Sequence, residues 1–259
     1  MTDPASLAAP VEAALRATRQ TVLDAYRAVA DPERFKDDGS AVTDLDLALE
    51  AQLGEALMPL DETFGLHGEE SGLMREGSPT WHLDPVDGTA NFSRRIGLFG
   101  SQLVLMDGDD PLFAAVYEPL LDEYTWAAKG AGTWHEGRRV TMPDRPRKHS
   151  VLYMDISRSG LFEEQRSLIM AIRRGVYKTR SLGSVAIHMR DVAMGAADGY
   201  LGGRRYRTPL HDLGPGTLLI REAGGLVTDE HGVDALKERQ VVIAAAPQLH
   251  AWLTEAIAP

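Results

Sequence analysis

The chain contains no cysteine among its 259 residues. This absence excludes disulfides, a thiolate nucleophile and a zinc site built on cysteine. Asparagine is also nearly absent, which is compatible with a heat-tolerant source. Residues 1–4 lack the basic start and apolar stretch of a secretory signal, and no apolar run is long enough to span a bilayer. We therefore expect a cytoplasmic protein that does not bind membranes.

Positive charge is in short supply, with 27 Lys and Arg against 38 Asp and Glu and a formal net charge of -11. Such a balance argues against nucleic acid as a partner, because a phosphate backbone needs a positive binding surface. The hydrophobic fraction of 44% is ordinary for a globular protein. An acidic protein that handles an anionic substrate needs cations at its site, and bound metal ions would supply them.

Hydrophobic periodicity divides the chain into two parts at a segment rich in proline and charge, residues 143–148. The first part, residues 1–146, predicts an α+β domain with two amphipathic helices, at 7–30 and 43–57, and strands at 63–68, 81–84, 102–106, 113–117, 124–126 and 132–134. The second part, residues 147–259, predicts an α/β domain with strands at 151–154, 199–201, 226–227 and 241–245 and helices at 161–172, 185–196, 213–223 and from 247.

The most informative segment is Asp84-Pro85-Val86-Asp87-Gly88-Thr89. The apolar residues before Asp84 predict a strand, and Pro85 predicts a turn there because proline cannot continue the ladder. Residues 88–92 are typical of a turn that opens a helix, whose free N–H groups favour an anion. Two carboxylates beside such amide donors fit a metal-bridged phosphate ester.

Two further acidic segments can join this motif. One is Gly68-Glu69-Glu70-Ser71-Gly72, which is predicted to follow a strand. The other is Asp212, which precedes the predicted helix at 213–223. Taken alone, the first segment is more typical of a solvated turn than of a metal site, and an aspartate in the second position is typical of a helix N-cap.

Together these segments resemble the signature motifs of the inositol monophosphatase family, the magnesium-dependent, lithium-sensitive sugar and polyol phosphatases. The resemblance rests on Gly68-Glu69-Glu70, on the run from Asp84 to Thr89, and on Asp212 with Glu222-Ala223-Gly224-Gly225. Val42-Thr43-x-x-Asp46 and Gly183-Ser184 occur in the same order. The resemblance implies a layered αβαβα sandwich, a homodimer and a phosphoric monoester hydrolase.

The resemblance also implies a role for individual residues. Two or three Mg²⁺ ions would be held by the Val86 carbonyl and by the side chains of Glu70, Asp84, Asp87 and Asp212. Thr89 and Asp46 would orient the attacking water, with Glu70 assisting catalysis, and no serine or histidine nucleophile is needed. The substrate would contact Asp87, the N–H groups of Gly88 and Thr89, and also Gly183, Ser184, Val185, Arg205 and Asp212.

The substrate is less clearly indicated. Arg205 stands where inositol phosphatases carry a glutamate, and with Arg204 and Arg207 it predicts either contact with a second anionic group or a solvated loop. We expect a small phosphorylated polyol or sugar of the inositol-1-phosphate or fructose-1,6-bisphosphate type. Adenosine 3′,5′-bisphosphate and histidinol phosphate are alternatives, as is a catalytically silent family member. His211 stands where the family typically carries tryptophan, either as packing or as a hydrogen-bond partner of Asp212.

Overall fold

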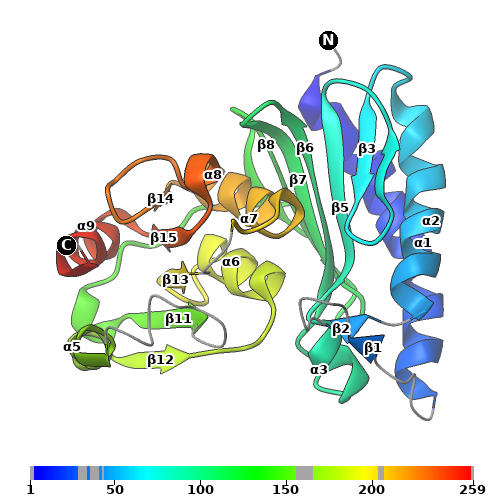
Figure 1. The fold of residues 1–259 in the computed structure, drawn as a ribbon. Helices are drawn as coiled ribbons and strands as arrows, with labels where there is room; N and C mark the ends of the chain where they lie inside the picture. Colours follow the sequence, from blue (N-terminus) through cyan, green and yellow to red (C-terminus); the bar gives the residue numbers. More distant parts are fainter. Residues whose placement is uncertain are drawn as a thin grey trace.

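The computed structural model describes residues 3–28, 34–35, 41–42, 44–155, 166–203 and 207–257. Five layers follow one another across the molecule (Figure 1), as the family resemblance implies. The outer helices are α1 (Ala8–Arg27) and α2 (Asp44–Leu57) on one side, and α5 (Arg166–Gly175) and α9 (Pro247–Ile257) on the other. The inner helices α6 (Val185–Ala193) and α7 (Leu210–Glu222) lie between two sheets.

The larger sheet has eight strands in the order β10-β9-β8-β7-β6-β5-β3-β4, of which only β3 and β5 pair in parallel. Its strands are β3 (Gly65–Gly68), β4 (Gly72–Arg75), β5 (Thr80–Asp87), β6 (Gly100–Asp107), β7 (Asp110–Glu118), β8 (Glu123–Ala128), β9 (Gly132–His135) and β10 (Arg138–Val140). The smaller sheet has the order β12-β11-β13-β15-β14. Its strands are β11 (Val151–Asp155), β12 (Lys178–Arg180), β13 (Gly199–Gly203), β14 (Leu226–Thr228) and β15 (Val241–Ala245).

Short elements complete the described chain: the strand pair β1 (Arg34–Phe35) and β2 (Ala41–Val42), the helices α3 (Thr89–Ser93) and α8 (Ala235–Glu238), and single 3-10 turns at Pro4–Leu7, Met58–Leu60 and Arg147–His149. The strands β4, β10 and β12 were not predicted. Each has four residues or fewer, too few for an alternating pattern to stand out. Among the described residues, no helix is both long and apolar enough to cross a membrane.

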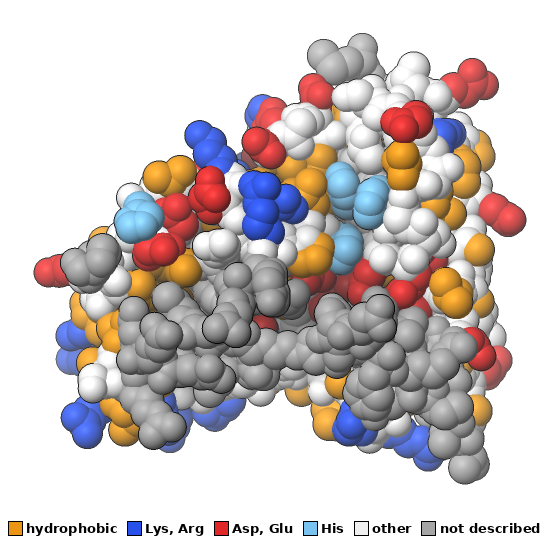
Figure 2. All heavy atoms as spheres, in the orientation of Figure 1, with side chains coloured by type: hydrophobic (Ala, Val, Ile, Leu, Met, Phe, Trp, Pro, Cys, Tyr) orange, Lys and Arg blue, Asp and Glu red, His pale blue; other side chains and the backbone are white. Residues whose placement is uncertain are grey.

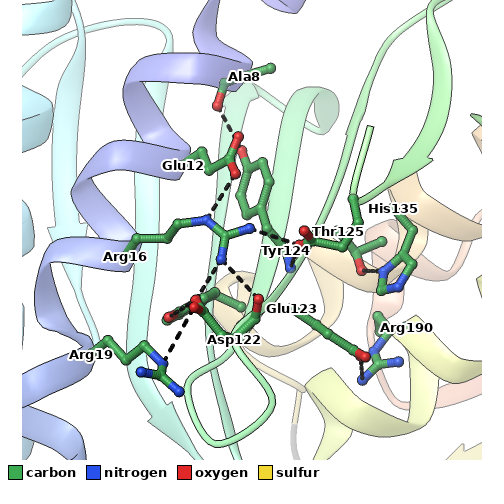
Figure 3. Close-up of polar contacts among 12 residues, drawn as sticks. Ala8, Glu12, Arg16, Arg19, Asp122, Glu123, Tyr124, Thr125, His135 and Arg190 are labelled. Carbon is green, nitrogen blue, oxygen red and sulfur yellow. Dashed lines mark hydrogen bonds and ion pairs between the residues drawn. The ribbon is translucent and has the colours of Figure 1, made fainter. Parts of the chain in front are cut away.

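Helix α1 buries an apolar face and is also tied to the large sheet by charge. Arg16 on α1 forms ion pairs with Glu12 on its own helix and with Asp122 in the β7–β8 turn, as Figure 3 shows. It also pairs with Glu136 beyond β9. The Tyr117 hydroxyl donates to the same Asp122 carboxylate over 2.8 Å. This network fixes α1 on the sheet, and the helix ends at Arg27, while the end predicted at 30–32 falls outside the described residues.

Helix α2 buries the predicted apolar stripe of Leu45, Leu49, Leu53 and Leu57. The same helix also buries two acidic side chains, Asp46 and Glu50, which are 2% and 0% exposed. Buried carboxylates need hydrogen bonds or cations to offset the loss of hydration. The buried face of helix α2 therefore carries ionisable side chains as well as apolar ones. Thr43, where the predicted helix begins, lies outside the described residues.

One apolar core crosses the boundary that the sequence predicts at residue 146. It packs side chains of the large sheet, such as Val104 and Val116, against Met189 on α6 and Leu213 on α7. The two sheets are formed by the chain before and after residue 146, respectively. Helix α7, although it comes late in the sequence, is thereby held against β5, β6 and β7, the strands that carry or flank the acidic motif.

Two local predictions are wrong. The chain does not turn at Pro85, because β5 continues to Asp87 through an irregularity in its pairing with β6. Asp212 is not the N-cap of its helix, because α7 begins at Leu210 with Pro209 in the N-cap position, so that Asp212 lies in the first helical turn. Both differences matter for the site. The predicted helix at 161–172 is described from Arg166 to Gly175.

Candidate active site

Three aspartates from distant parts of the chain converge between the large sheet and α7. Asp84 and Asp87 come from β5, and Asp212 comes from α7. One carboxylate oxygen from each lies within 4.8 Å of the others, close enough to share a cation. Asp84 and Asp212 are buried and Asp87 is half-buried. The end of β5 and the first turn of α7 therefore meet at this cluster.

The irregularity in β5 places both of its aspartates on the same side of the sheet. Asp84 pairs with Gln102 and Asp87 pairs with Gly100, so three steps along β5 lie opposite two steps along β6. In a regular strand, residues three apart face opposite sides. The extra residue is a bulge, and a bulge re-aims the side chains next to it. Pro85 is tolerated here because a bulge releases its position from the ladder.

Burial, together with the crowding of the carboxylates, raises the pKa values of Asp84 and Asp87. Burial raises the pKa of Asp84 well above its usual range, and the charges of Glu69, Asp87 and Asp212 act in the same direction. Burial and the charge of Asp212 raise the pKa of Asp87 to about 7, despite two hydrogen bonds that oppose the rise. Because repulsion of this kind is relieved by a bound cation, the cluster has the electrostatics of a metal centre.

The segment 182–186 holds Asp87 from the α6 side. The Ser184 hydroxyl and the Ala186 N–H, which lies 2.7 Å away, both donate to Asp87 Oδ2. The Asn91 side-chain amide, from the single asparagine of the chain, donates to the carbonyls of Leu98 and Leu182, each over 2.7 Å. Ser184 also caps α6. The clamp therefore fixes the orientation of Asp87 before any ligand binds.

Thr89 and Asp46, which the resemblance pairs, lie side by side. Thr89 Oγ1 is 3.5 Å from Asp46 Oδ1 and donates to the Val86 carbonyl over 3.0 Å. Gly88 precedes Thr89 with a φ of 93°, a left-handed conformation that favours glycine. This glycine turns the chain out of the sheet and into α3, and so brings the Thr89 hydroxyl back over Val86.

In the 68–71 turn, Glu69 lies close enough for its charge to act on both Asp84 and Asp87. Gly68 pairs in parallel with Leu83, and the Glu69 N–H donates to the Leu83 carbonyl over 3.0 Å. These contacts set Glu69 beside Asp84, and the charge of Glu69 is the largest charge effect on the pKa of Asp84. Glu69 is not among the predicted site residues, and its place beside Asp84 depends on the parallel pairing of β3 with β5, which the sequence does not reveal.

Three histidines adjoin the acidic cluster, a grouping that the sequence did not predict. The rings of His67 and His82 lie 5.4 Å apart on neighbouring strands, and His211 Nε2 lies 3.8 Å from Asp212 Oδ1. Figure 2 shows histidine side chains gathered on this face between basic side chains and a group of acidic ones. Strand alternation puts His82 on the same side of β5 as Asp84, which is the signal that could have located it.

Only some of the other residues predicted to contact the substrate lie in the part of the chain that the structure describes. Val185 is 6% exposed and packs into the core that crosses residue 146, and Gly183 adopts a φ of 77° beside Asn91. Arg204 and Arg205 lie outside the described residues. Arg207 donates to the backbone carbonyls of Lys237 and Glu238 at the end of α8. That side chain of the basic cluster is therefore engaged by the protein itself.

The donors present fit a hard cation. The three groups that could share an ion are all carboxylates, and oxygen ligands of this kind suit Mg²⁺, which also keeps several waters. Burial first, and repulsion between the carboxylates second, raise the pKa values of Asp84 and Asp87, and a bound cation would oppose both effects. Sequence and structure therefore agree on an acidic, oxygen-rich centre at the end of β5.

Comparison with known proteins assigns the family. The sequence model of the inositol monophosphatase family matches residues 3–258. A relative from Thermococcus kodakarensis, named fructose-1,6-bisphosphatase/inositol-1-monophosphatase, is 30% identical over 85% of this chain and 84% of its own length. An inositol-1-monophosphatase from Mesorhizobium japonicum is 28% identical over 99% and 97%.

A solved structure confirms the fold. The extragenic suppressor protein suhB from Bartonella henselae superimposes with a TM-score of 0.89 over 97% of this chain and 98% of its own, at 24% identity. The likeness in fold and the match along the whole sequence lead to the same result. The chain belongs to the inositol monophosphatase family and is a phosphoric monoester hydrolase.

Proposed function

We propose that this protein is a Mg²⁺-dependent phosphatase that hydrolyses a small phosphorylated polyol or sugar by direct attack of water. The observation that carries the proposal is the convergence of Asp84, Asp87 and Asp212 within 4.8 Å beside the Thr89–Asp46 pair. This arrangement unites a cation-binding centre and a water-orienting pair, the two parts that such hydrolysis requires.

Glu69, Asp84, Asp87, Asp212 and the Val86 carbonyl would hold the ions. We place Glu69 in the role that the sequence argument gave to Glu70, because the charge of Glu69 acts on both Asp84 and Asp87. When bound, Mg²⁺ would acidify a water molecule and neutralise the charge of the phosphate. The number of oxygen donors around the cluster supports a centre that holds two or three ions.

The chain's own side chains would then orient the water and receive its proton. Thr89 Oγ1 donates to the Val86 carbonyl, which leaves its lone pairs free to accept a hydrogen bond from water. As Thr89 Oγ1 receives the water's proton, its own hydrogen would turn from the Val86 carbonyl to Asp46 Oδ1, 3.5 Å away, so that the Asp46 carboxylate ends protonated and the water becomes hydroxide. With one O–H bond held by Thr89, a lone pair of the water points away from the protein and toward the phosphorus.

The substrate class follows from the relatives. Proteins named fructose-1,6-bisphosphatase/inositol-1-monophosphatase and inositol monophosphatase match most of this chain. We therefore rank inositol-1-phosphate and fructose-1,6-bisphosphate first. Gly183, Ser184 and the N–H groups of Gly88 and Thr89 border Asp87 and would contact the phosphate. Family resemblance further supports inhibition by Li⁺ and assembly into a homodimer. Light scattering would measure the oligomeric state.

The test is release of inorganic phosphate from purified protein with Mg²⁺ or with EDTA. Inositol-1-phosphate, fructose-1,6-bisphosphate, adenosine 3′,5′-bisphosphate and histidinol phosphate would be compared, with and without Li⁺. We expect Mg²⁺-dependent release from one of the first two and its loss in Asp212→Asn, an isosteric change that removes one charge. Release in EDTA, or undiminished release by Asp212→Asn, would contradict the proposal.

A further inference from the structure

Glu50 on α2 is a carboxylate without contact with solvent, at 0% exposure. Both of its oxygens are used by the backbone of the 68–71 turn. Oε2 accepts the Glu70 N–H and Oε1 accepts the Ser71 N–H, each over 2.9 Å. Hydrogen bonds to a charged acceptor are stronger than neutral ones, and a buried charge is retained only where such bonds compensate it. Glu50 is therefore committed to holding this turn.

Because Gly68 has no side chain, the Glu50 carboxylate fits against its backbone. A Cβ added to Gly68 would lie 2.2 Å from Glu50 Cδ and 2.4 Å from each carboxylate oxygen. These distances are well below van der Waals contact, so any larger residue at position 68 would displace the carboxylate. Because the φ of Gly68 is not in the left-handed region, its glycine is explained by this close approach. Gly68 and Glu50 form a matched pair.

The turn that Glu50 holds carries Glu69. The Glu69 N–H donates to the Leu83 carbonyl, and the next two N–H groups along the chain donate to Glu50. Glu69 is thus fixed on both sides, by β5 on one and by α2 on the other. Its charge acts on Asp84 and Asp87, so a shift of the turn would reach the acidic cluster directly.

The same helix also carries Asp46, one turn before Glu50. Asp46 lies beside Thr89, and Glu50 holds the Glu69 turn. Four residues along a helix project from the same face. Helix α2 therefore connects two parts of the site that come from separate segments of the large sheet, and it fixes the distance between them.

We propose that Glu50 is a positioning residue, which holds the 68–71 turn so that Glu69 completes the cation-binding centre. The inference rests on the function proposed above. Glu50 itself touches neither ion nor substrate. Its effect should appear in the affinity for metal rather than in the chemical step at saturating metal.

The experiment compares Glu50→Gln with Glu55→Gln, a matched change at an exposed position of the same helix. Glutamine keeps the shape but presents an NH₂ group to one of the two N–H donors. We expect the Mg²⁺ concentration for half-maximal phosphate release to rise by about 10- to 100-fold in Glu50→Gln. We expect the substrate KM and the kcat at saturating Mg²⁺ to change little, and Glu55→Gln to match the wild type.

Two measurements do not depend on activity. Binding of Mn²⁺, followed by electron paramagnetic resonance, should weaken in Glu50→Gln by a similar factor, and the amides of Glu70 and Ser71 should exchange faster with solvent. A lower melting temperature with unchanged metal affinity would overturn the proposal, because it would leave Glu50 a purely structural role. Wild-type protein without phosphatase activity would instead refute the proposed function, while Mn²⁺ binding would still test Glu50.

If Glu50→Gln does not fold, Gly68→Ala provides a second route. The added methyl group would push the carboxylate aside and leave its charge in place. We expect the same direction of change in Mn²⁺ affinity. Gly72→Ala serves as the control, because a Cβ at Gly72 meets no atom within 4 Å, although its φ of 66° also strains alanine. Unchanged Mn²⁺ affinity in Gly68→Ala would contradict the positioning role.

Discussion

Replacing Asp87 by asparagine should stabilise the metal-free protein while it abolishes activity. Asparagine can accept the hydrogen bonds of Ser184 and Ala186 through its carbonyl oxygen, so the clamp survives. What disappears is the cost of holding a charge in a buried, acidic place, a cost that raises the pKa of Asp87 from 3.8 to about 7. The difference between these two values corresponds to about 4 kcal/mol of unfolding free energy.

The sign of the pH dependence follows from the direction of this change. Because the folded-state pKa lies above the unfolded value, protonated Asp87 favours the fold. This contribution is fully present below pH 3.8 and is lost as the pH rises through about 7. In EDTA, we therefore expect Asp87→Asn to exceed the wild type in stability by about 2–4 kcal/mol near pH 8, and by about 1–2 kcal/mol near pH 5.

Urea denaturation at the two pH values, with EDTA or with Mg²⁺, would measure these differences. Saturating Mg²⁺ should stabilise the wild type, by about 2.7 kcal/mol at a hundredfold excess over its Kd, and should stabilise Asp87→Asn far less. Phosphate release by the variant should be absent although its circular dichroism is native. A variant that is less stable than the wild type in EDTA near pH 8, or one that keeps its activity, would refute the reasoning.

Three further predictions concern the surroundings of the acidic cluster. Thr89→Ala should lower kcat by about 10²- to 10³-fold at saturating Mg²⁺, and Thr89→Ser should restore most of it; equal loss in both would contradict a role for the hydroxyl. Burial lowers the pKa of His188 to about 4, so its contribution to stability is present above pH 6.5 and is lost as the pH falls through 4. The stability of the wild type relative to His188→Gln should therefore fall by about 3 kcal/mol over that range, whereas a constant difference in urea denaturation would refute this. Arg16→Met should cost about 1–2 kcal/mol of unfolding free energy, less at high salt, because its ion pairs are partly exposed; a loss that is independent of salt would assign the effect to packing.

The local patterns of the sequence located the principal elements. The spacing of Leu45, Leu49, Leu53 and Leu57 predicted the buried stripe of α2, and alternation predicted strands that occur within β5, β6, β7 and β8. These signals are reliable because each repeats over several turns or residues. The short strands β4, β10 and β12 were missed, since three or four residues offer little such repetition. Taken singly, the acidic segments also fitted a solvated turn or a helix cap. Only their occurrence together, in the order of the family, indicated a metal site.

What the sequence could not supply was the geometry between distant segments. The bulge that aims Asp84 and Asp87 in one direction depends on the register of β5 against β6. The role proposed for Glu69 depends on the parallel pairing of β3 with β5, and the role proposed for Glu50 depends on how closely α2 approaches Gly68.

By itself, therefore, the amino-acid sequence determined which groups can bind a cation and a phosphate, because oxygen ligands and their order along the chain are local properties. The tertiary structure decided which of these groups meet and which side chains hold them in place, because register and packing are set by contacts between residues far apart in the chain.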